Sequence, residues 1–258
     1  MPVTVTFTLT AATPQKVGAD LLAVPVFSGR VLGPGGRPVN TALGGGLAEF
    51  MVEAGFEGKV DEALAVPAAG VAAKAVLLVG VGERDRITLD SIRRAGAALA
   101  RKGSKAKTVA TTILDAVPPG IDRAAAAQAL AEGFALGGYR FLRYKQKQDA
   151  SATETLLVVG KKDAAIQAAL ERGAAVAGAV AWARDLVNEP AGALTPTVLA
   201  EQAQRAADEG GLGIEVLDEI AIANEGLGGL LGVSLGSEQP PRLIKLTYEP
   251  GGRPRGTV

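Results

Sequence analysis

The sequence predicts an α/β fold. Apolar runs rich in Val, Leu and Ile alternate with longer stretches of helical periodicity, which is the order of elements in α/β proteins. Runs such as Ala75 to Val79 are hydrophobic at every position, a pattern typical of strands that are buried on both faces of a parallel sheet. A chain of 258 residues with 48% hydrophobic and 21% charged residues fits one large domain or two small ones.

Residues 1–162 contain the elements of an N-terminal α/β domain. The predicted strands are Val3–Leu9, Leu21–Phe27, Ala75–Gly80, Val109–Leu114 and Thr155–Val159. The predicted helices are Leu47–Ala54, Leu89–Lys102 and Arg123–Gly137. Thr88 is a suitable N-cap for the second of these helices, and Gly103 follows its last residue.

One long helix is predicted next, over residues 163–188. It is dense in alanine and contains Gly173 and Gly178, so it suits close packing against another helix. It ends at Asn188-Glu189-Pro190, because the residue before a proline is pushed out of the helical region. We expect this helix to connect two domains.

Residues 189–258 read as the truncated start of a second domain. Thr195-Pro196 begins a helix that stops at Gly210-Gly211. The other expected elements are strands at Ile214–Leu217, Leu230–Leu235 and Leu243–Tyr248, a short helix capped by Asp218, and a loop at Glu249–Val258. A segment of about 70 residues is at the lower limit for independent folding. We therefore expect its apolar strands to require a covering partner.

The composition excludes several classes of function. The chain has no cysteine and no histidine, so it has no disulfide, no thiol nucleophile, no Ser-His-Asp triad and no imidazole-bound metal. Lys plus Arg and Asp plus Glu both number 27, and a net charge of zero argues against a dedicated nucleic-acid binder. The N-terminus is unlike a signal peptide and no run is long enough to span a bilayer, so a cytoplasmic protein without a membrane partner is expected.

Two glycine-rich segments invite comparison with phosphate-binding loops. Val79-Gly80-Val81-Gly82 follows a strand and precedes a helix, but Asp85 stands where the dinucleotide fingerprint needs a third glycine. A tight turn from strand to helix is the favoured interpretation. Gly44-Gly45-Gly46 before Leu47 is similarly interpreted as a turn rather than an anion site.

A basic and aromatic segment is the candidate nucleic-acid contact. Residues 138–147 contain the cations Arg140, Arg143, Lys145 and Lys147 among three aromatic residues, a combination that can stack bases and pair with phosphates. The alternative is an exposed segment whose aromatic side chains anchor it while the cations stay in water. The neutral total charge favours the alternative, and DNA remains an unlikely partner by this reasoning.

The most specific motifs lie in the last third of the chain. They are Trp182 to Pro190 (WARDLVNEP), the following Leu194-Thr195-Pro196, the glycine-rich Gly226 to Val233, and Gly236-Ser237 with Pro240 to Ile244 (PPRLI). In this order they resemble the start of the catalytic domain of the leucyl (cytosol) aminopeptidases, peptidase family M17. Upstream, Ala131 to Gly133 and Tyr139 to Phe141 resemble the N-terminal domain of the same family.

The resemblance implies a metallopeptidase with a smaller, macro-like N-terminal α/β domain, a long connecting helix and a catalytic α/β domain. Members of the family form homo-hexamers and release N-terminal amino acids from peptide substrates. They use two divalent metals, zinc or manganese, held by lysine and carboxylate side chains without histidine. The absence of histidine is thus compatible with this family.

This sequence departs from the family pattern at its end. In the family, the metal-binding lysine and aspartate follow the strand that corresponds here to Leu243–Tyr248, and the remaining ligands and the catalytic arginine come later. The present sequence ends at Val258, before any of these motifs. We therefore expect no catalytic residue, no metal ligand and no cofactor in this chain, and no activity from it alone.

Overall fold

The computed structural model describes residues 5–146 and 153–250. By its internal contacts the chain divides into two units, Met1–Ala183 and Arg184–Val258. Each unit is described separately. In the part of the chain that is described, no helix is both long and apolar enough to cross a membrane.

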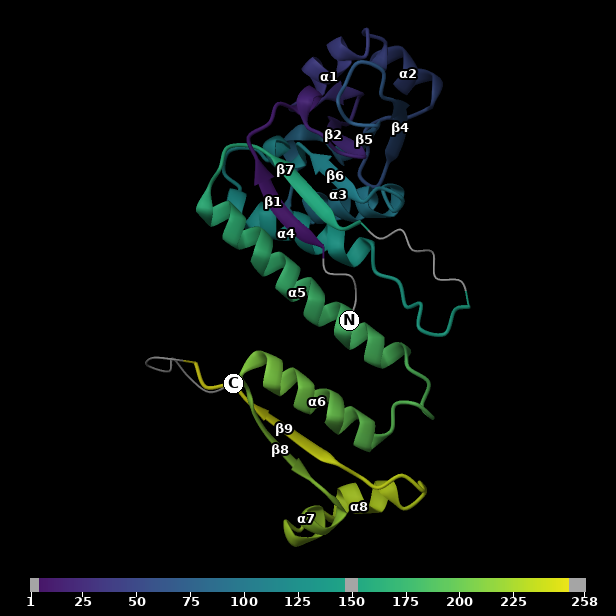
Figure 1. Cartoon of the computed structure of the whole chain (residues 1–258), viewed down its shortest axis with the longest axis vertical. Helices are drawn as coiled ribbons and strands as arrows, with labels where there is room; N and C mark the ends of the chain where they lie inside the picture. The colour runs from purple at the N-terminus through teal and green to yellow at the C-terminus, as the bar shows by residue number, and fades with distance from the viewer. Residues whose placement is uncertain (1–4, 147–152, 251–258) are drawn as a thin grey trace. The chain divides into compact units, whose positions relative to one another are not determined.

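Unit 1 is built on one mixed sheet, which has seven strands among the described residues (Figure 1). The strands are β1 (Thr6–Thr10), β2 (Leu21–Phe27), β3 (Val31–Leu32), β4 (Ala63–Pro67), β5 (Ala75–Gly82), β6 (Thr108–Thr111) and β7 (Thr155–Val159). Their order is β1-β7-β6-β2-β5-β4, and β3 pairs with β2. The inner pairs are parallel, while β4 and β3 are antiparallel to their neighbours. The α/β class predicted from the alternating pattern is confirmed.

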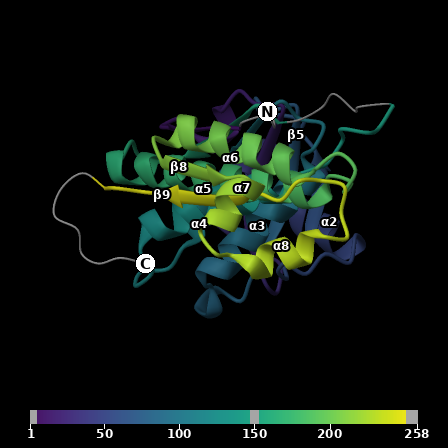
Figure 2. The same ribbon diagram turned by 90° about the horizontal axis from the view of Figure 1, so that it is seen from below.

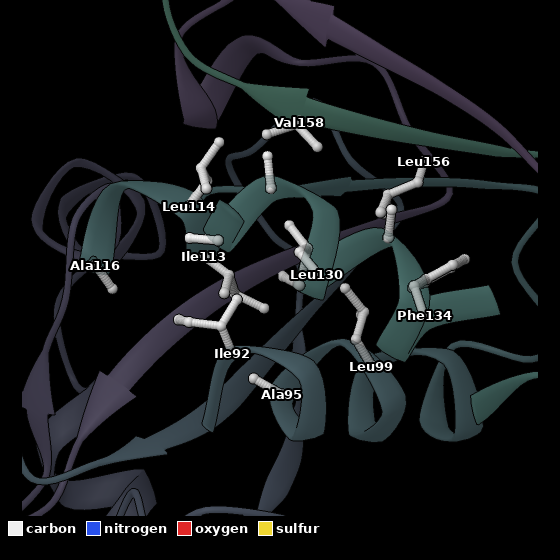
Figure 3. Close-up of a cluster of buried hydrophobic side chains, with 14 of the residues drawn as sticks. Ile92, Ala95, Leu99, Ile113, Leu114, Ala116, Leu130, Phe134, Leu156 and Val158 are labelled. Atoms are coloured by element: carbon white, nitrogen blue, oxygen red, sulfur yellow. The ribbon is translucent and has the colours of Figure 1, made fainter. Parts of the chain in front are cut away.

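Three helices cover one face of this sheet. They are α3 (Leu89–Lys102), α4 (Arg123–Gly137) and α5 (Ala164–Asn188), and their apolar side chains pack with those of β1, β6 and β7. Figure 3 shows Ile92 and Leu99 of α3 pointing toward Leu130 and Phe134 of α4 beneath the strand residue Leu156. All five side chains are almost wholly buried. This is the main core of the chain.

Two shorter helices cover the opposite face. Val39 of α1 (Gly36–Ala42) and Met51 of α2 (Leu47–Glu53) pack with Val24 of β2 and Leu78 of β5. Neighbouring positions in β2 and β5 belong to opposite clusters, since Ala23 and Leu77 join the first core. A strand buried on both faces has no polar position, which explains the continuous hydrophobicity of these runs.

Side chains cap the three longer helices of unit 1, and Thr88 is the cap among them that the sequence predicts. Thr88 accepts the backbone N–H of Ser91 at 3.2 Å, and the Ser91 hydroxyl accepts the N–H of Thr88 at 2.7 Å, which forms a capping box at α3. Asp122 caps α4 through the N–H of Ala124. Asp163 accepts the N–H of Ala165 at 2.8 Å, so the long helix starts at Ala164 rather than at Asp163.

The described residues of unit 2 form a two-stranded ribbon with the helices α6, α7 and α8. Strand β8 (Gly213–Leu217) pairs antiparallel with β9 (Leu243–Thr247), and α6 (Pro196–Gly210) contacts both strands (Figures 1 and 2). Two short helices, α7 (Glu219–Asn224) and α8 (Gly228–Ser234), lie between the strands in the sequence. Thr195 caps α6 with Pro196 at its first position, as predicted.

Two strand predictions are wrong in whole or in part. Of residues 230–235, predicted as a strand, 230–234 belong to helix α8 and Leu235 is its C-cap, because a short apolar run fits a helix turn as well as a strand. The predicted strand Val109–Leu114 ends at Thr111 and is followed by the 3-10 turn η3 (Ile113–Ala116). The Thr111 hydroxyl accepts the N–H of Ile113 at 3.1 Å and thereby turns the chain out of the sheet.

Candidate functional site

A cavity of about 260 Å³ opens at the carboxyl ends of β2 and β5 in unit 1. Ser28 follows β2, Val81 and Gly82 form the end of β5, and Glu83 follows that strand. The remaining lining residues are Lys59 and Val60 in the loop after α2, Arg86 before α3 and Ser91 in the first turn of α3. The cavity therefore combines hydroxyl groups and charged side chains with an apolar wall.

The topology of the sheet explains why the cavity lies there. After β2 the chain leads to α1 and α2 on one face, whereas after β5 it leads to α3 on the other face. Neighbouring parallel strands whose connections leave in opposite directions open a crevice at their carboxyl ends, where α/β proteins commonly bind ligands. Sequence reasoning missed this cavity, because strand order is not visible in a single sequence.

Two glycines in the Val79–Gly82 motif allow another part of the chain to approach. A Cβ atom at Gly80 would lie 2.8 Å from the carbonyl carbon of Gly58, and one at Gly82 would lie 2.9 Å from a methyl of Val60. Gly82 also has a φ of +87°, a conformation that favours glycine. The motif thus closes the strand end against residues 58–60, in agreement with its interpretation as a turn.

The charged groups around the cavity are held in ion pairs. Arg86 contacts Glu83 at 3.1 Å, and Lys59 contacts Glu57. The hydrogen bond to Glu57 and its negative charge raise the pKa of Lys59, and the same contact lowers the pKa of Glu57. A lysine whose pKa is raised stays protonated near neutral pH, so Lys59 is suited to hold an anion and not to act as a base.

Ser91 at the cavity wall is committed to the capping box of α3. Its hydroxyl donates to the carbonyl oxygen of Thr88 at 2.9 Å while accepting the Thr88 N–H. A serine engaged in this way lacks the adjacent base that activates a nucleophile.

The basic and aromatic segment follows α4. Arg140, Arg143 and Lys145 are exposed, whereas Lys147 lies outside the described residues. The rings of Phe141 and Tyr144 contact each other with centroids 5.9 Å apart. The three described cations thus share one exposed segment with an aromatic pair, an arrangement that both interpretations of the sequence allow.

Two carboxylates of unit 2, those of Asp218 and Glu219, have contacts within the fold. Asp218 accepts the N–H groups of Ile220 and Ala221 and so caps α7. Glu219 forms an ion pair with Arg242 at 2.9 Å, which links α7 to the residues before β9. No group of three or more acidic residues that is suited to a metal ion occurs in residues 5–146 and 153–250.

The fold is that of an α/β aminopeptidase. A tomato leucine aminopeptidase mutant matches it with a TM-score of 0.86 over 98% of this chain and 52% of its own, at 24% identity. The chain belongs to the cytosol aminopeptidase family. The N-terminal domain of that family matches residues 23–148, and its catalytic domain matches residues 181–258.

Other relatives agree with this assignment. A probable cytosol aminopeptidase of Acaryochloris marina is 36% identical, with 93% of this chain and 52% of the relative aligned. The bottromycin maturation enzyme BotP in complex with Mn is 32% identical, with a TM-score of 0.75 over 91% of this chain and 46% of its own. The chain thus spans about half the length of the relatives it matches.

Proposed function

We propose that this chain supplies the N-terminal domain and the first part of the catalytic domain of a leucyl aminopeptidase that releases N-terminal amino acids from peptides. The observation that carries this proposal is that both domains of one family match in sequence order, at residues 23–148 and 181–258. The proposed boundaries are an N-terminal domain at 1–162, a connecting helix at 163–188 and the start of the catalytic domain at 189–258.

The proposed reaction requires two divalent metals, zinc or manganese, as in the family. The BotP structure in complex with Mn supports divalent metal use among relatives. The carboxylates Asp218 and Glu219 of this chain instead serve as a helix cap and an ion-pair partner. We therefore assign no catalytic residue and no metal ligand to the chain, and we expect it to be inactive alone. A cytoplasmic location and a homo-hexameric assembly are proposed from the family.

The test is hydrolysis of a leucyl chromogenic amide in the presence of manganese or zinc. The chain alone is compared with a fusion in which the second half of the Acaryochloris marina relative continues it after Val258. We expect turnover by the fusion and none by the chain. An inactive, folded fusion would contradict the proposed function, and activity that follows the chain alone through purification would contradict its proposed inactivity.

A nucleic-acid module is the second candidate function. The exposure of Arg140, Arg143 and Lys145 beside the Phe141–Tyr144 ring pair is the observation in its favour. Phosphate contacts by three cations give affinity that falls steeply with salt. Retention on duplex DNA at about 150 mM salt, lost when the three cations are replaced by alanine, would support this function.

A further inference from the structure

Strand β1 forms one edge of the sheet of unit 1 (Figure 1). Among the described residues it pairs only with β7, in parallel. Thr6 donates its N–H to the carbonyl oxygen of Glu154, just before β7, at 2.9 Å. Because the backbone groups of successive residues in a strand point to opposite sides within the sheet, Phe7 and Leu9 present theirs at the open edge. Such an edge is a template for pairing with another strand.

The sequence of β1 makes this edge well suited to pairing. Residues 6–10 (TFTLT) alternate β-branched threonines with large apolar residues and include no proline and no charged residue. Their register with β7 is continuous over all five positions, without a bulge. Proline, lysine and bulges are the usual features that keep edge strands from pairing with other chains. The edge strand on the other side of the sheet, β4, ends in Pro67, whereas β1 must be protected by another part of the chain.

A glutamine side chain from α5 occupies the open edge of β1. The Nε2 atom of Gln167 donates to the carbonyl oxygen of Phe7 at 3.0 Å, and its Oε1 atom accepts the N–H of Leu9 at 3.2 Å. In a parallel pair of strands, one residue of the neighbouring strand donates its N–H to the first of these groups and accepts from the second. The Gln167 amide therefore makes the two hydrogen bonds that one residue of an additional parallel strand would make.

The surroundings of Gln167 hold its amide in this position. Nε2 also donates to Oε1 of Glu171, one turn further along α5, at 2.9 Å. The amide nitrogen, which has two hydrogens, thus has two acceptors. Ile166 and Leu170 are buried in the main core, and Asp163 caps the helix, so the first turns of α5 are fixed against the sheet. Gln167 itself is half-buried, and its side chain is directed at β1 by the packing of its neighbours.

We propose that Gln167 blocks the open edge of β1 and so prevents the sheets of two copies of this chain from joining through their β1 strands. A second copy is the strand donor that the block excludes, because two β1 strands related by a two-fold axis present the same alternation to each other and pair antiparallel. Since the side-chain amide occupies the carbonyl oxygen of Phe7 and the N–H of Leu9, an incoming strand has to displace Gln167 before it can bind these groups.

Two substitutions of Gln167 in the full chain test the proposal. Gln167→Leu removes both hydrogen bonds and keeps a side chain of similar size, whereas Gln167→Asn keeps the amide but is one methylene too short to reach β1. Light scattering after gel filtration gives the mass of each variant over a series of protein concentrations. We expect both variants to have a higher mass than wild type at the same concentration, and the excess to grow with concentration. In dilute solution, amide exchange of Leu9 should be faster than in wild type by roughly three- to tenfold.

The matched control is Gln204→Leu in α6. Gln204 is also exposed on a helix, and its amide donates to Asp208, four residues further on, at 2.9 Å, as that of Gln167 does to Glu171. This substitution adds the same apolar side chain without opening the edge of β1, so the variant should keep the mass of wild type.

A rescue experiment identifies the strand that is responsible. Thr8 is exposed in the middle of β1, and Thr8→Lys places a charge on the edge strand. Added to Gln167→Leu or to Gln167→Asn, this substitution should restore the mass of wild type. Association that Thr8→Lys does not reverse would overturn the proposal, as would a wild-type mass of both Gln167 variants at every concentration. Unchanged exchange of Leu9 would also overturn it. If Gln167→Leu does not fold, the milder Gln167→Asn decides between these outcomes.

Discussion

The crossing of α3 and α4 gives the sharpest quantitative prediction. Gly133 in α4 lies against α3, and a Cβ atom there would lie 2.7 Å from the carbonyl carbon of Arg93 and 2.9 Å from its Cα. Backbone atoms cannot move aside as the end of a flexible side chain can. The substitution Gly133→Ala therefore forces the two helices apart at the main core of unit 1.

The expected change in the free energy of unfolding is the cost of overpacking minus the gain in helix propensity. Overpacking of a well-packed core costs about 1–3 kcal/mol. Replacing glycine by alanine within a helix raises the free energy of unfolding by about 0.5–1 kcal/mol through helix propensity. The clash involves backbone on both sides, so we expect Gly133→Ala to lower the free energy of unfolding by about 1–2 kcal/mol. Gly178 in α5 is the matched control, since it is exposed and its Cβ would meet nothing within 4 Å.

Urea denaturation followed by far-UV circular dichroism measures both variants. Gly178→Ala should raise the free energy of unfolding by about 0.5–1 kcal/mol, because only helix propensity changes. Thermal midpoints should move in the same directions, by roughly 2–4 °C per kcal/mol. If Gly133→Ala were as stabilising as Gly178→Ala, α3 and α4 would not be in the close contact described, and the reasoning would be refuted.

Three further predictions concern charge, stability and binding. Hydrogen bonds from Lys74 and from the backbone of Thr108 lower the pKa of Asp20, so the stability that Asp20 gives is full above its ordinary value of 3.8 and is lost as pH falls below it. The difference in urea midpoint between wild type and Asp20→Asn should therefore shrink on acidification; a constant difference would contradict the assignment. In limited proteolysis, residues 184–258 should be cleaved earlier in the digestion than unit 1, because the buried apolar residues of the described part of unit 2 are Ala200, Ala203, Ala207 and Ile222 alone. If both units resisted the protease equally, the inference that the small core of unit 2 makes it less stable would be contradicted. The Arg140→Ala/Arg143→Ala/Lys145→Ala variant should elute from duplex DNA like wild type at about 150 mM salt; retention of wild type alone would favour the nucleic-acid function.

Sequence reasoning succeeded where local chemistry decides the structure. The predicted caps Thr88, Thr195 and Asp218 define helix starts through side-chain hydrogen bonds to residues two or three positions away. It failed where distant contacts decide. The sequence of β4 carries no clear strand pattern and was not predicted as a strand. In the structure, Ala63 to Pro67 pair with β5. The cavity at Ser28 and Lys59 depends on strand order, which no local pattern encodes.

The error at Leu230–Leu235 bears on the function. As a predicted strand, this segment is among those whose apolar side chains we expect to require a covering partner. As helix α8 it leaves Val233 and Leu235 in solvent and leaves the edges of β8 and β9 open among the described residues. An apolar helix that finds no core in its own unit must find one elsewhere or remain exposed at a cost in free energy. The end of α8 thus marks apolar surface that the described residues of unit 2 do not cover.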